Sequence, residues 1–233
     1  MLFNVCRSPI AALAAVLCFS VALGARQDHQ DTPRDQWQRV TDVFEAMGLG
    51  PGSVVADLGA GGGWFTTRLA RAVGTGGRVY AVDVNPVSLR ELREGLPKEL
   101  TNVEIVRGEE NDPKLPPGQL DAVLVVNAYH EFAEYPAVLS RVKEALKPGG
   151  RLVVIEPAPR RTEDTTRAAQ TRRHTIAMAL VEDELAQAGY EIVRKDPAFV
   201  SRPAHQEPNG TTVKPTDWLL VARRPADSRP FAR

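Results

Sequence analysis

The stretch from Val54 to Phe65, Val-Val-Ala-Asp-Leu-Gly-Ala-Gly-Gly-Gly-Trp-Phe, constrains the fold of this chain more than any other. An apolar run leads into an acid and a glycine cluster, and apolar residues at helical spacing follow through Leu69 and Val73. This order predicts a strand, a tight turn and the start of a helix. Glycines let a ligand approach the backbone, and the free N–H groups of a helix start favour an anionic or polar ligand group. The stretch therefore predicts a ligand-binding turn.

The spacing of these glycines argues against a dinucleotide. That fingerprint needs glycines at its first, third and sixth positions, and the sixth position counted from Gly59 is Trp64, whose side chain would block helix–strand packing. The segment instead resembles the first motif of class I S-adenosylmethionine-dependent methyltransferases, in which an acid stands two residues before Gly-x-Gly-x-Gly. The resemblance implies that the S-adenosylmethionine cofactor is bound by residues of this segment: Asp57, Gly59, Ala60, Gly61 and Gly63.

The N-terminus has the pattern of a secretory leader. A basic residue, Arg7, precedes an uncharged apolar run over 9–23 and the small residues Gly24 and Ala25, which predicts a signal peptide over 1–24 and an exported protein, periplasmic or secreted. The run is shorter than the roughly 20 residues that span a bilayer. Two alternatives remain, a cytoplasmic protein and one anchored to the membrane by an uncleaved leader. Both cysteines, Cys6 and Cys18, lie in the leader, which excludes disulfides and thiolate sites from the mature chain.

The composition of the chain limits the kinds of partner that it is expected to bind. The chain has 29 basic and 29 acidic residues, so it has no general electrostatic reason to bind nucleic acid. We expect a small-molecule substrate and no nucleic acid, and the oligomeric state is open. The length after the leader suits one domain, which we place at 35–224, with the segments 25–34 and 225–233 expected to be disordered.

Strand and helix patterns alternate along the rest of the chain. After the glycine turn we expect strands at 78–83, 103–106, 122–126, 152–155, 190–193 and 218–221, and helices at 35–47, 87–95, 137–147 and 173–188. This alternation predicts a single-domain α/β protein with a Rossmann-like, doubly wound, seven-stranded and mainly parallel sheet. Its ligand crevice should lie at the carboxyl ends of the strands. The family resemblance further implies that the last strand runs antiparallel.

Residues that directly follow the strands are the candidates for ligand contacts. Asp83 ends the second strand, and a carboxylate there can accept hydrogen bonds from a ribose diol, which both NAD and S-adenosylmethionine carry. By resemblance, an acid after the third strand meets adenine, and Glu109 fits that position best, with Asp112 second. The resemblance also places Asn127, which follows the fourth strand, beside the cofactor.

The segment Asn127-Ala128-Tyr129-His130-Glu131-Phe132 holds the candidate catalytic residues. A neutral His130 could remove a proton from an acceptor hydroxyl or amine near neutral pH, and Tyr129 could shape the pocket beside the sulfonium. The alternative is that both side chains only pack. Arginines that follow the fifth strand, Arg167 among them, could hold a substrate carboxylate or phosphate or simply be solvated. The four histidines show no metal-ligand spacing, and we expect no metal site.

These patterns together predict a methyltransferase that moves a methyl group from S-adenosylmethionine to an unidentified, small-molecule acceptor. Two alternatives remain: a non-catalytic nucleoside-binding module of the same fold, and an NAD-dependent oxidoreductase. Export would raise a further question, since S-adenosylmethionine is made in the cytoplasm.

Overall fold

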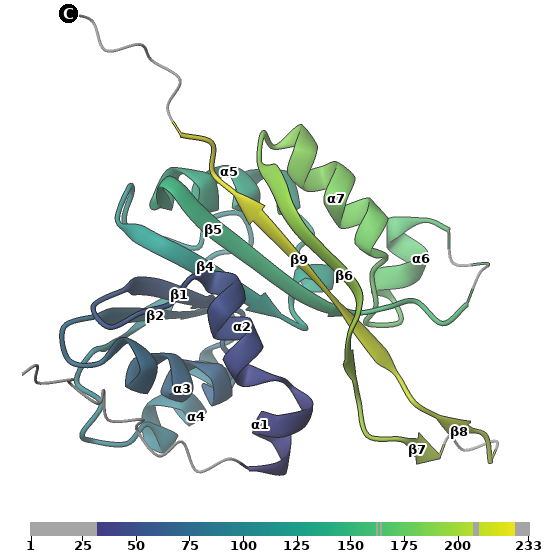
Figure 1. Cartoon of the computed structure of the whole chain (residues 1–233), viewed down its shortest axis with the longest axis horizontal. Coiled ribbons are helices and arrows are strands. Elements are labelled where there is room, and N and C mark those ends of the chain that lie inside the picture. Colours follow the sequence, from purple (N-terminus) through teal and green to yellow (C-terminus); the bar gives the residue numbers. More distant parts are fainter. Residues whose placement is uncertain (1–31, 162, 164, 207–209, 227–233) are drawn as a thin grey trace, which may run out of the picture.

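A computed structural model describes residues 32–161, 163, 165–206 and 210–226. The predicted signal peptide lies outside the described residues. One seven-stranded sheet in the order β3-β2-β1-β4-β5-β9-β6 runs through the molecule, with helices on both faces (Figure 1). The strands are β1 Val54–Leu58, β2 Arg78–Asp83, β3 Val103–Arg107, β4 Leu120–Val126, β5 Leu146–Pro157, β6 Glu191–Ser201 and β9 Thr216–Arg223, and a separate hairpin pairs β7 His205–Gln206 with β8 Thr212–Val213.

The directions of the strands confirm the predicted fold class. β1 pairs in parallel with β2 and β4, β2 with β3, and β4 with β5, whereas β9 runs antiparallel to both β5 and β6. The sheet is thus mainly parallel with β9 reversed, as the resemblance implied. The chain leaves β1 for β2 on one side and places β4 on the other, so the strand order reverses at β1. Ligands of open α/β sheets bind at such a reversal, outside the carboxyl ends of the strands.

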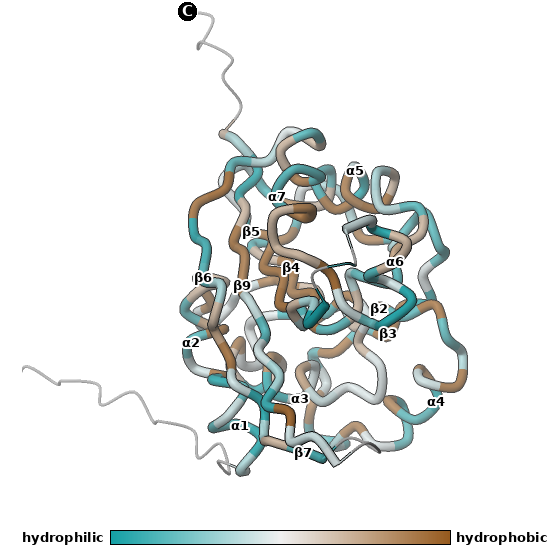
Figure 2. The backbone as a smooth tube through the Cα atoms, turned by 90° about the vertical axis from the view of Figure 1, so that its right-hand side faces the viewer, coloured by the Kyte–Doolittle hydropathy of each residue, from teal (hydrophilic) through white to brown (hydrophobic). Residues whose placement is uncertain are grey.

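Two apolar layers enclose the sheet. The helices are α1 Pro33–Trp37, α2 Val40–Met47, α3 Trp64–Val73, α4 Pro86–Gly95, α5 Tyr135–Ala145, α6 Arg167–Thr171 and α7 Met178–Gln187, with a short 3₁₀ turn η1 Tyr129–Glu131. One core cluster joins the sheet to α2 and α3, and the other joins it to α5 and α7. In Figure 2 the most hydrophobic backbone lies in β4 and β5 at the centre, as expected of strands buried on both faces. In the part of the chain that the structure describes, no helix is long and apolar enough to cross a membrane.

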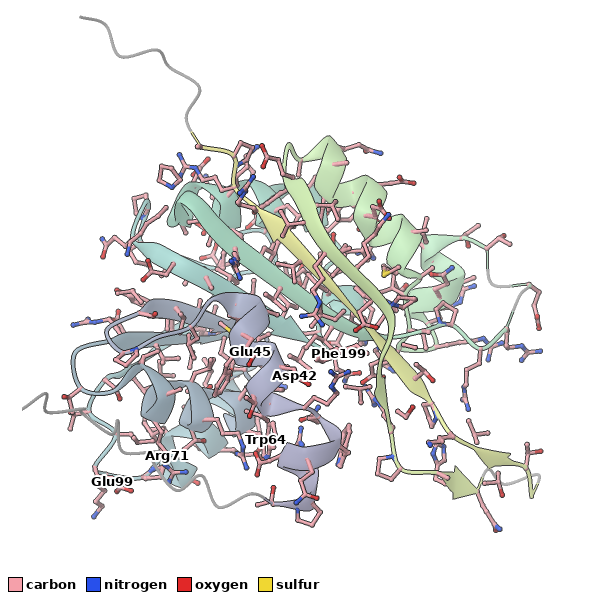
Figure 3. All side chains as sticks on the ribbon, in the orientation of Figure 1. Asp42, Glu45, Trp64, Arg71, Glu99 and Phe199 are labelled. Carbon is pink, nitrogen blue, oxygen red and sulfur yellow. The ribbon has the colours of Figure 1, made fainter. Side chains whose placement is uncertain are left out.

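The N-terminal helix expected over 35–47 is two helices. Thr32 caps α1 through a capping box with Asp35, and Pro33 occupies the first turn, so residues 32–34, which we expected to be disordered, form the start of a helix. The break falls at Arg39, which has a φ of 53° and whose guanidinium Nη1 donates to the carbonyl oxygen of Phe199 at 2.9 Å. Phe199 lies beside α2 (Figure 3). A tertiary contact to β6 has therefore overridden the helical pattern.

Two further boundaries near the site differ from the prediction. The helix expected from Arg173 begins only at Met178, because residues 172–177 form an irregular segment after α6 in which His174 has a φ of 52°. β6 extends to Ser201 instead of ending near Val193, because it pairs with β9 through two register shifts. The first difference matters for function because it places His174 in a turn and not in a helix.

Candidate functional site

The glycine turn after β1 allows neighbouring side chains to pack directly against its backbone. Gly59, Gly61 and Gly63 all have positive φ, at 80°, 52° and 82°. A Cβ at Gly59 would lie 2.4 Å from Cβ of Ala128, and one at Gly63 would lie 2.8 Å from Cγ of Leu92, so these two glycines permit close packing against η1 and α4. A Cβ at Gly61 meets open space. Gly61 is therefore the glycine of the three whose missing side chain leaves room for a ligand.

The carboxylate of Asp83 fixes this turn from the end of β2. Its Oδ2 accepts from the backbone N–H of Gly61 at 2.8 Å, and its Oδ1 accepts from the N–H of Asn85 at 2.8 Å. Each carboxylate oxygen can accept more than one hydrogen bond, so Asp83 keeps acceptor capacity for a diol. Ala60 supports the turn through its backbone, which donates to the carbonyl oxygen of Val82 at 3.0 Å.

A cavity of about 520 Å³ lies at the carboxyl ends of β1, β2 and β4. Five of the predicted cofactor residues line it: Gly59, Gly61, Asp83, Glu109 and Asn127. Its apolar wall includes Phe132, Ala133 and Val138, and Glu131 borders it from η1. We call the four residues Gly59, Gly61, Asp83 and Glu109 the cofactor half of this crevice.

Asp57 lies beneath the turn and not in the cavity wall. It is buried, and its Oδ2 accepts from the hydroxyl of Thr66 at 2.6 Å. Burial raises the pKa of Asp57 to about 6, with the nearby charge of Asp83 acting in the same direction and the Thr66 hydrogen bonds opposing both. The acid of the motif thus connects the end of β1 to the first turn of α3.

The two candidate adenine contacts, Glu109 and Asp112, both lie in the loop after β3, but their side chains have different surroundings. Glu109 lines the cavity, whereas the side chain of Asp112 caps its own turn by accepting from the N–H of Lys114 at 2.8 Å. Glu109 also forms an exposed ion pair with Lys114 and borders a second, adjoining cavity of about 770 Å³. The geometry therefore places Glu109 and not Asp112 where a cofactor can reach it.

Asn127 ends β4 in a left-handed conformation, with a φ of 54°. Its Oδ1 accepts from Nη2 of Arg202 at 3.2 Å, and Nε of Arg202 donates to both carboxylate oxygens of Asp217 in β9, at 2.7 and 2.8 Å. Non-glycine residues with positive φ are uncommon and often mark functional positions. This turn aims the following segment, η1, across the mouth of the crevice.

Tyr129 points away from the cavity. The side chain is fully buried, and its hydroxyl donates to Oε2 of Glu184 in α7 at 2.8 Å. Burial, together with the Glu184 carboxylate, raises the pKa of this hydroxyl. The structure places Tyr129 in the core, where it joins η1 to α7, and not in the cavity wall. Arg167 is also directed to Glu184, because its Nε donates to Oε1 of Glu184 at 2.8 Å. Its guanidinium therefore does not extend to the cavity as that of a substrate-binding arginine would.

His130 is held by a buried acid, Glu156, at the end of β5. Nδ1 of His130 lies 2.7 Å from Oε2 of Glu156, and Oε1 of Glu156 accepts from the backbone N–H of Tyr129 at 2.7 Å. The side chains of His130 and Glu156 are 1% and 0% exposed. In the neutral ring this contact puts the hydrogen on Nδ1 and leaves the lone pair on Nε2.

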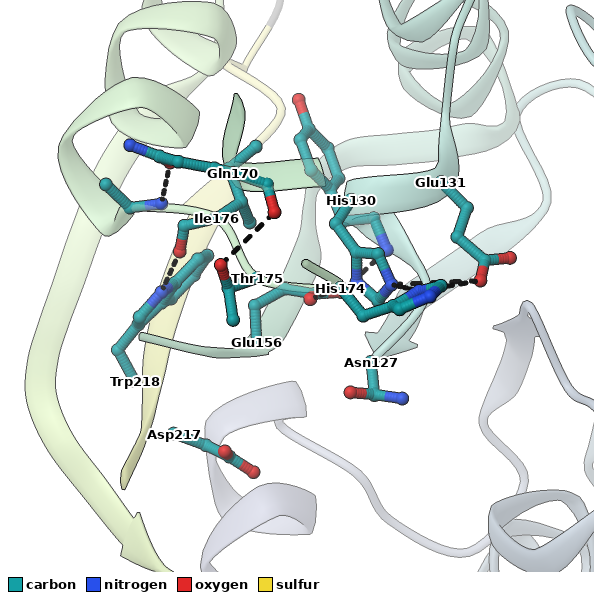
Figure 4. A network of polar contacts seen from close by, with 12 residues as sticks. Asn127, His130, Glu131, Glu156, Gln170, His174, Thr175, Ile176, Asp217 and Trp218 are labelled. Carbon is teal, nitrogen blue, oxygen red and sulfur yellow. Dashed lines mark hydrogen bonds and ion pairs between the residues drawn. The ribbon is translucent and has the colours of Figure 1, made fainter. Parts of the chain in front are cut away.

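A second histidine covers that lone pair. Nδ1 of His174 lies 3.3 Å from Nε2 of His130, with the two rings nearly perpendicular, and the carboxylate of Glu131 approaches both (Figure 4). We call His130, Glu131, Glu156 and His174 the acceptor rim. It adjoins the cavity through Glu131.

Comparison with known proteins gives the fold its family. Residues 55–150, which include β1 to β4 and the whole glycine turn, match a family described as a methyltransferase domain. The crystal structure of a SAM-dependent methyltransferase from Aquifex aeolicus is 25% identical, with a TM-score of 0.64 over 83% of this chain and 94% of that one. The matched domain and the fold are those of the class I S-adenosylmethionine-dependent methyltransferases.

Curated relatives of this methyltransferase are similar to about half of the chain. The ubiquinone/menaquinone biosynthesis C-methyltransferases of Pasteurella multocida and Teredinibacter turnerae are 33% and 30% identical over 122 residues, or 52% of this chain. The aligned region spans 45% and 48% of those two proteins, so the chain matches about half the length of the curated relatives. An S-adenosylmethionine-dependent methyltransferase from Mesorhizobium loti has the same fold at 18% identity and a TM-score of 0.58.

The cofactor of this methyltransferase family is S-adenosylmethionine, and the residues of the cofactor half fit it. Gly61 leaves the ligand side of the turn open, Asp83 offers a carboxylate with free lone pairs, and Glu109 lies further along the same cavity. When bound, S-adenosylmethionine supplies an activated methyl group on a positively charged sulfur. The residues named here would hold and orient it.

The rim residues Glu131, Glu156 and His174 were missed as site residues, as was the anchoring acid Glu184. Glu156 had a usable signal, because it stands at the end of the fifth parallel strand as Asp83 stands at the end of the second. His174 had none, since it is 44 residues from His130 and reaches it only through the irregular segment before α7.

Proposed function

We propose that this protein transfers a methyl group from S-adenosylmethionine to a small-molecule acceptor bound against the acceptor rim. The observation that carries the proposal is one cavity that adjoins both halves of the crevice, with Gly61 and Asp83 on one side and Glu131 on the other. In methyl transfer the donor brings its own activation, so the protein mainly aligns the reacting groups. A crevice with a well-formed cofactor half and a small rim suits that task.

The lone pair on Nε2 of His130, at the acceptor rim, can accept a proton from the acceptor. Glu156 fixes the ring and stabilises a positive charge on it, which is the arrangement that general-base histidines use. His174 has to turn aside for direct contact, and its 74% exposed side chain gives it room to do so.

The acceptor class that we would test first is a hydroquinone. The relatives from Pasteurella multocida and Teredinibacter turnerae are named for ubiquinone/menaquinone biosynthesis, and the apolar wall of Phe132, Ala133 and Val138 suits an aromatic ring. The similarity covers only about half of each relative, so amines and carboxylates belong in the same panel.

The test is production of S-adenosylhomocysteine by purified protein given S-adenosylmethionine and each acceptor class in turn. We expect acceptor-dependent turnover that the Gly61→Val variant lacks. Binding of S-adenosylhomocysteine without turnover on any acceptor class would favour the alternative of a nucleoside-binding module. Saturable NAD binding with hydride transfer would favour the oxidoreductase.

We also propose that the leader over 1–24 directs export and is removed, on the strength of its basic start, apolar run and small residues. N-terminal sequencing of the native protein should find a first residue at about position 25 or 26. An intact Met1 in a cytoplasmic fraction would contradict export and would also remove the question of how the enzyme obtains its cofactor.

A further inference from the structure

Three ligand-type atoms from two segments, η1 and the turn before α7, converge at the acceptor rim. Nε2 of His130 and Nδ1 of His174 are 3.3 Å apart, and Oε1 of Glu131 lies 3.7 Å from the first and 3.8 Å from the second. Ligands held about 2.1 Å from a tetrahedral or octahedral ion lie roughly 3.0–3.4 Å from one another. A contraction of a few tenths of an ångström, which the exposed Glu131 and His174 side chains can supply, would bring all three atoms onto one ion.

The surroundings of His130 are those of a metal ligand. Metal-binding histidines usually donate their other ring N–H to a carboxylate, which fixes the tautomer and raises the basicity of the ligating nitrogen. Glu156 supplies that carboxylate at 2.7 Å, and its own second oxygen is fixed by the N–H of Tyr129. A fully buried acid thus holds the imidazole so that its lone pair faces the other two ligands.

His174 is carried to this position by a strained and well-anchored turn. Its φ of 52° is unusual for a residue other than glycine. The segment around it is fixed by the side-chain Oε1 of Gln170, which accepts from the N–H of Ala177 at 2.7 Å, and by the indole N–H of Trp218, which donates to the carbonyl oxygen of Ile176 at 2.8 Å (Figure 4). The ring is 74% exposed, yet its Nδ1 faces inward towards His130. Strain that the surroundings maintain is a common property of ligand sites.

We propose that His130, His174 and Glu131 bind a divalent first-row transition metal ion at the edge of the cofactor cavity. Two imidazole nitrogens and one carboxylate oxygen suit Zn²⁺, Fe²⁺, Co²⁺ or Mn²⁺ better than Mg²⁺, which prefers oxygen ligands. The spacing of the histidines along the chain does not indicate this site, because the two histidines belong to separate turns that only the folded sheet brings together.

Three protein ligands leave coordination positions open, and the rim places them beside the cavity that Glu131 borders. A hydroxyl oxygen of the acceptor can take such a position, and this part of the inference rests on the proposed methyl transfer. The Nε2 lone pair of His130 can hold a proton or a metal ion but not both. With the ion bound, His130 positions the acceptor and does not act as a base.

The experiment is a titration of metal-stripped, tag-free protein with Co²⁺, followed by its visible d–d absorption, in the absence of any cofactor. We expect one saturating equivalent in the wild type, displaced by Zn²⁺ and not by an equal concentration of Mg²⁺. In His174→Ala the affinity for Co²⁺ should fall at least about 10-fold. Because the side chain of His174 is exposed, this change should spare the fold, and unchanged affinity for S-adenosylhomocysteine checks that it does.

The matched control is His205→Ala, which removes another exposed histidine in β7 and should leave Co²⁺ binding unchanged. Wild-type protein that binds Co²⁺ no better than His174→Ala would overturn the metal site, and so would equal weakening by the two substitutions. Either result leaves the proposed methyl transfer standing if S-adenosylhomocysteine still binds. Conversely, Co²⁺ binding by a protein with no affinity for S-adenosylhomocysteine would contradict the proposed function and not the metal site.

Discussion

The cofactor half and the acceptor rim of the crevice are assembled in different ways. Gly59, Gly61, Asp83 and Glu109 each lie at or within three residues of the end of a parallel strand. The backbone N–H of Gly61 donates to the side chain of Asp83, which joins the glycine turn to the end of β2. The rim joins η1, the end of β5 and the turn before α7, with 44 residues between its two histidines. The cofactor half is thus specified by local sequence, whereas the acceptor rim is specified by tertiary contacts. Substitutions should therefore separate cofactor binding from turnover.

The largest expected effect is on the rim. His130→Ala should lower turnover by about 10²–10⁴-fold. Both roles proposed for His130, as a base and as a metal ligand that positions the acceptor, depend on Nε2 of its ring. Affinity for S-adenosylhomocysteine, measured by calorimetry, should change by no more than a few fold. If the cofactor affinity collapses while turnover at saturation stays within a few fold of wild type, His130 only packs and the two halves are not separable.

The reciprocal change in the cofactor half is Gly61→Val. A branched side chain at a φ of 52° is strained, and it would occupy the open space on the ligand side of the turn. We expect at least about a 100-fold loss of S-adenosylhomocysteine affinity, a larger effect than one hydrogen bond carries. Co²⁺ binding at the rim should persist, and its loss would show that the turn and the rim fold as one unit.

The free energy of unfolding should depend on pH through Asp57, which lies beneath the glycine turn. The pKa of Asp57 is raised to about 6 in the folded protein, so ionisation of this carboxyl costs folding free energy as pH rises from about 4 through 6. Asp57→Asn removes that cost. Measured by urea unfolding without cofactor, the variant should gain on the order of 3 kcal/mol relative to wild type between pH 4 and pH 8. Parallel stability curves for the two proteins across this range would contradict the raised pKa.

A moderate loss is expected at Asp83, whose carboxylate both holds the turn and has lone pairs free for the ribose. Asp83→Ala should weaken S-adenosylhomocysteine binding by about 1–3 kcal/mol, the range for hydrogen bonds to a charged group. Asp112→Ala is the control in the loop after β3, because that side chain caps its own turn and does not line the cavity. An equal loss in the two variants would argue against the assignment of Asp83.

The smallest effect is expected at Tyr129. Tyr129→Phe removes one hydrogen bond to Glu184 and should cost about 1 kcal/mol of unfolding free energy. Turnover should remain within a few fold of wild type, since the hydroxyl points into the core. A drop in turnover comparable to that of His130→Ala would restore Tyr129 as a catalytic residue.

Sequence patterns alone were sufficient for the mainly parallel sheet, because strand, glycine turn and helix alternate at short range. The reversed last strand came only from the family resemblance, and the cofactor contacts stay predictions, although Gly59, Gly61, Asp83 and Glu109 line one cavity. Sequence patterns were not sufficient where long-range contacts decide. The first helix breaks at Arg39 because a carbonyl of β6 accepts from its guanidinium, and Tyr129 turns inward because Glu184 of α7 accepts from its hydroxyl. His174 belongs to the rim for the same kind of reason, since Gln170 and Trp218 fix its turn.

Calorimetric titration of the purified protein with S-adenosylhomocysteine and, separately, with NAD tests the assignment of the crevice most directly. The glycine turn with Trp64 at its sixth position, the open side of Gly61 and the carboxylate of Asp83 predict saturable one-site binding of S-adenosylhomocysteine and no binding of NAD. Saturable NAD binding with no response to S-adenosylhomocysteine would contradict it.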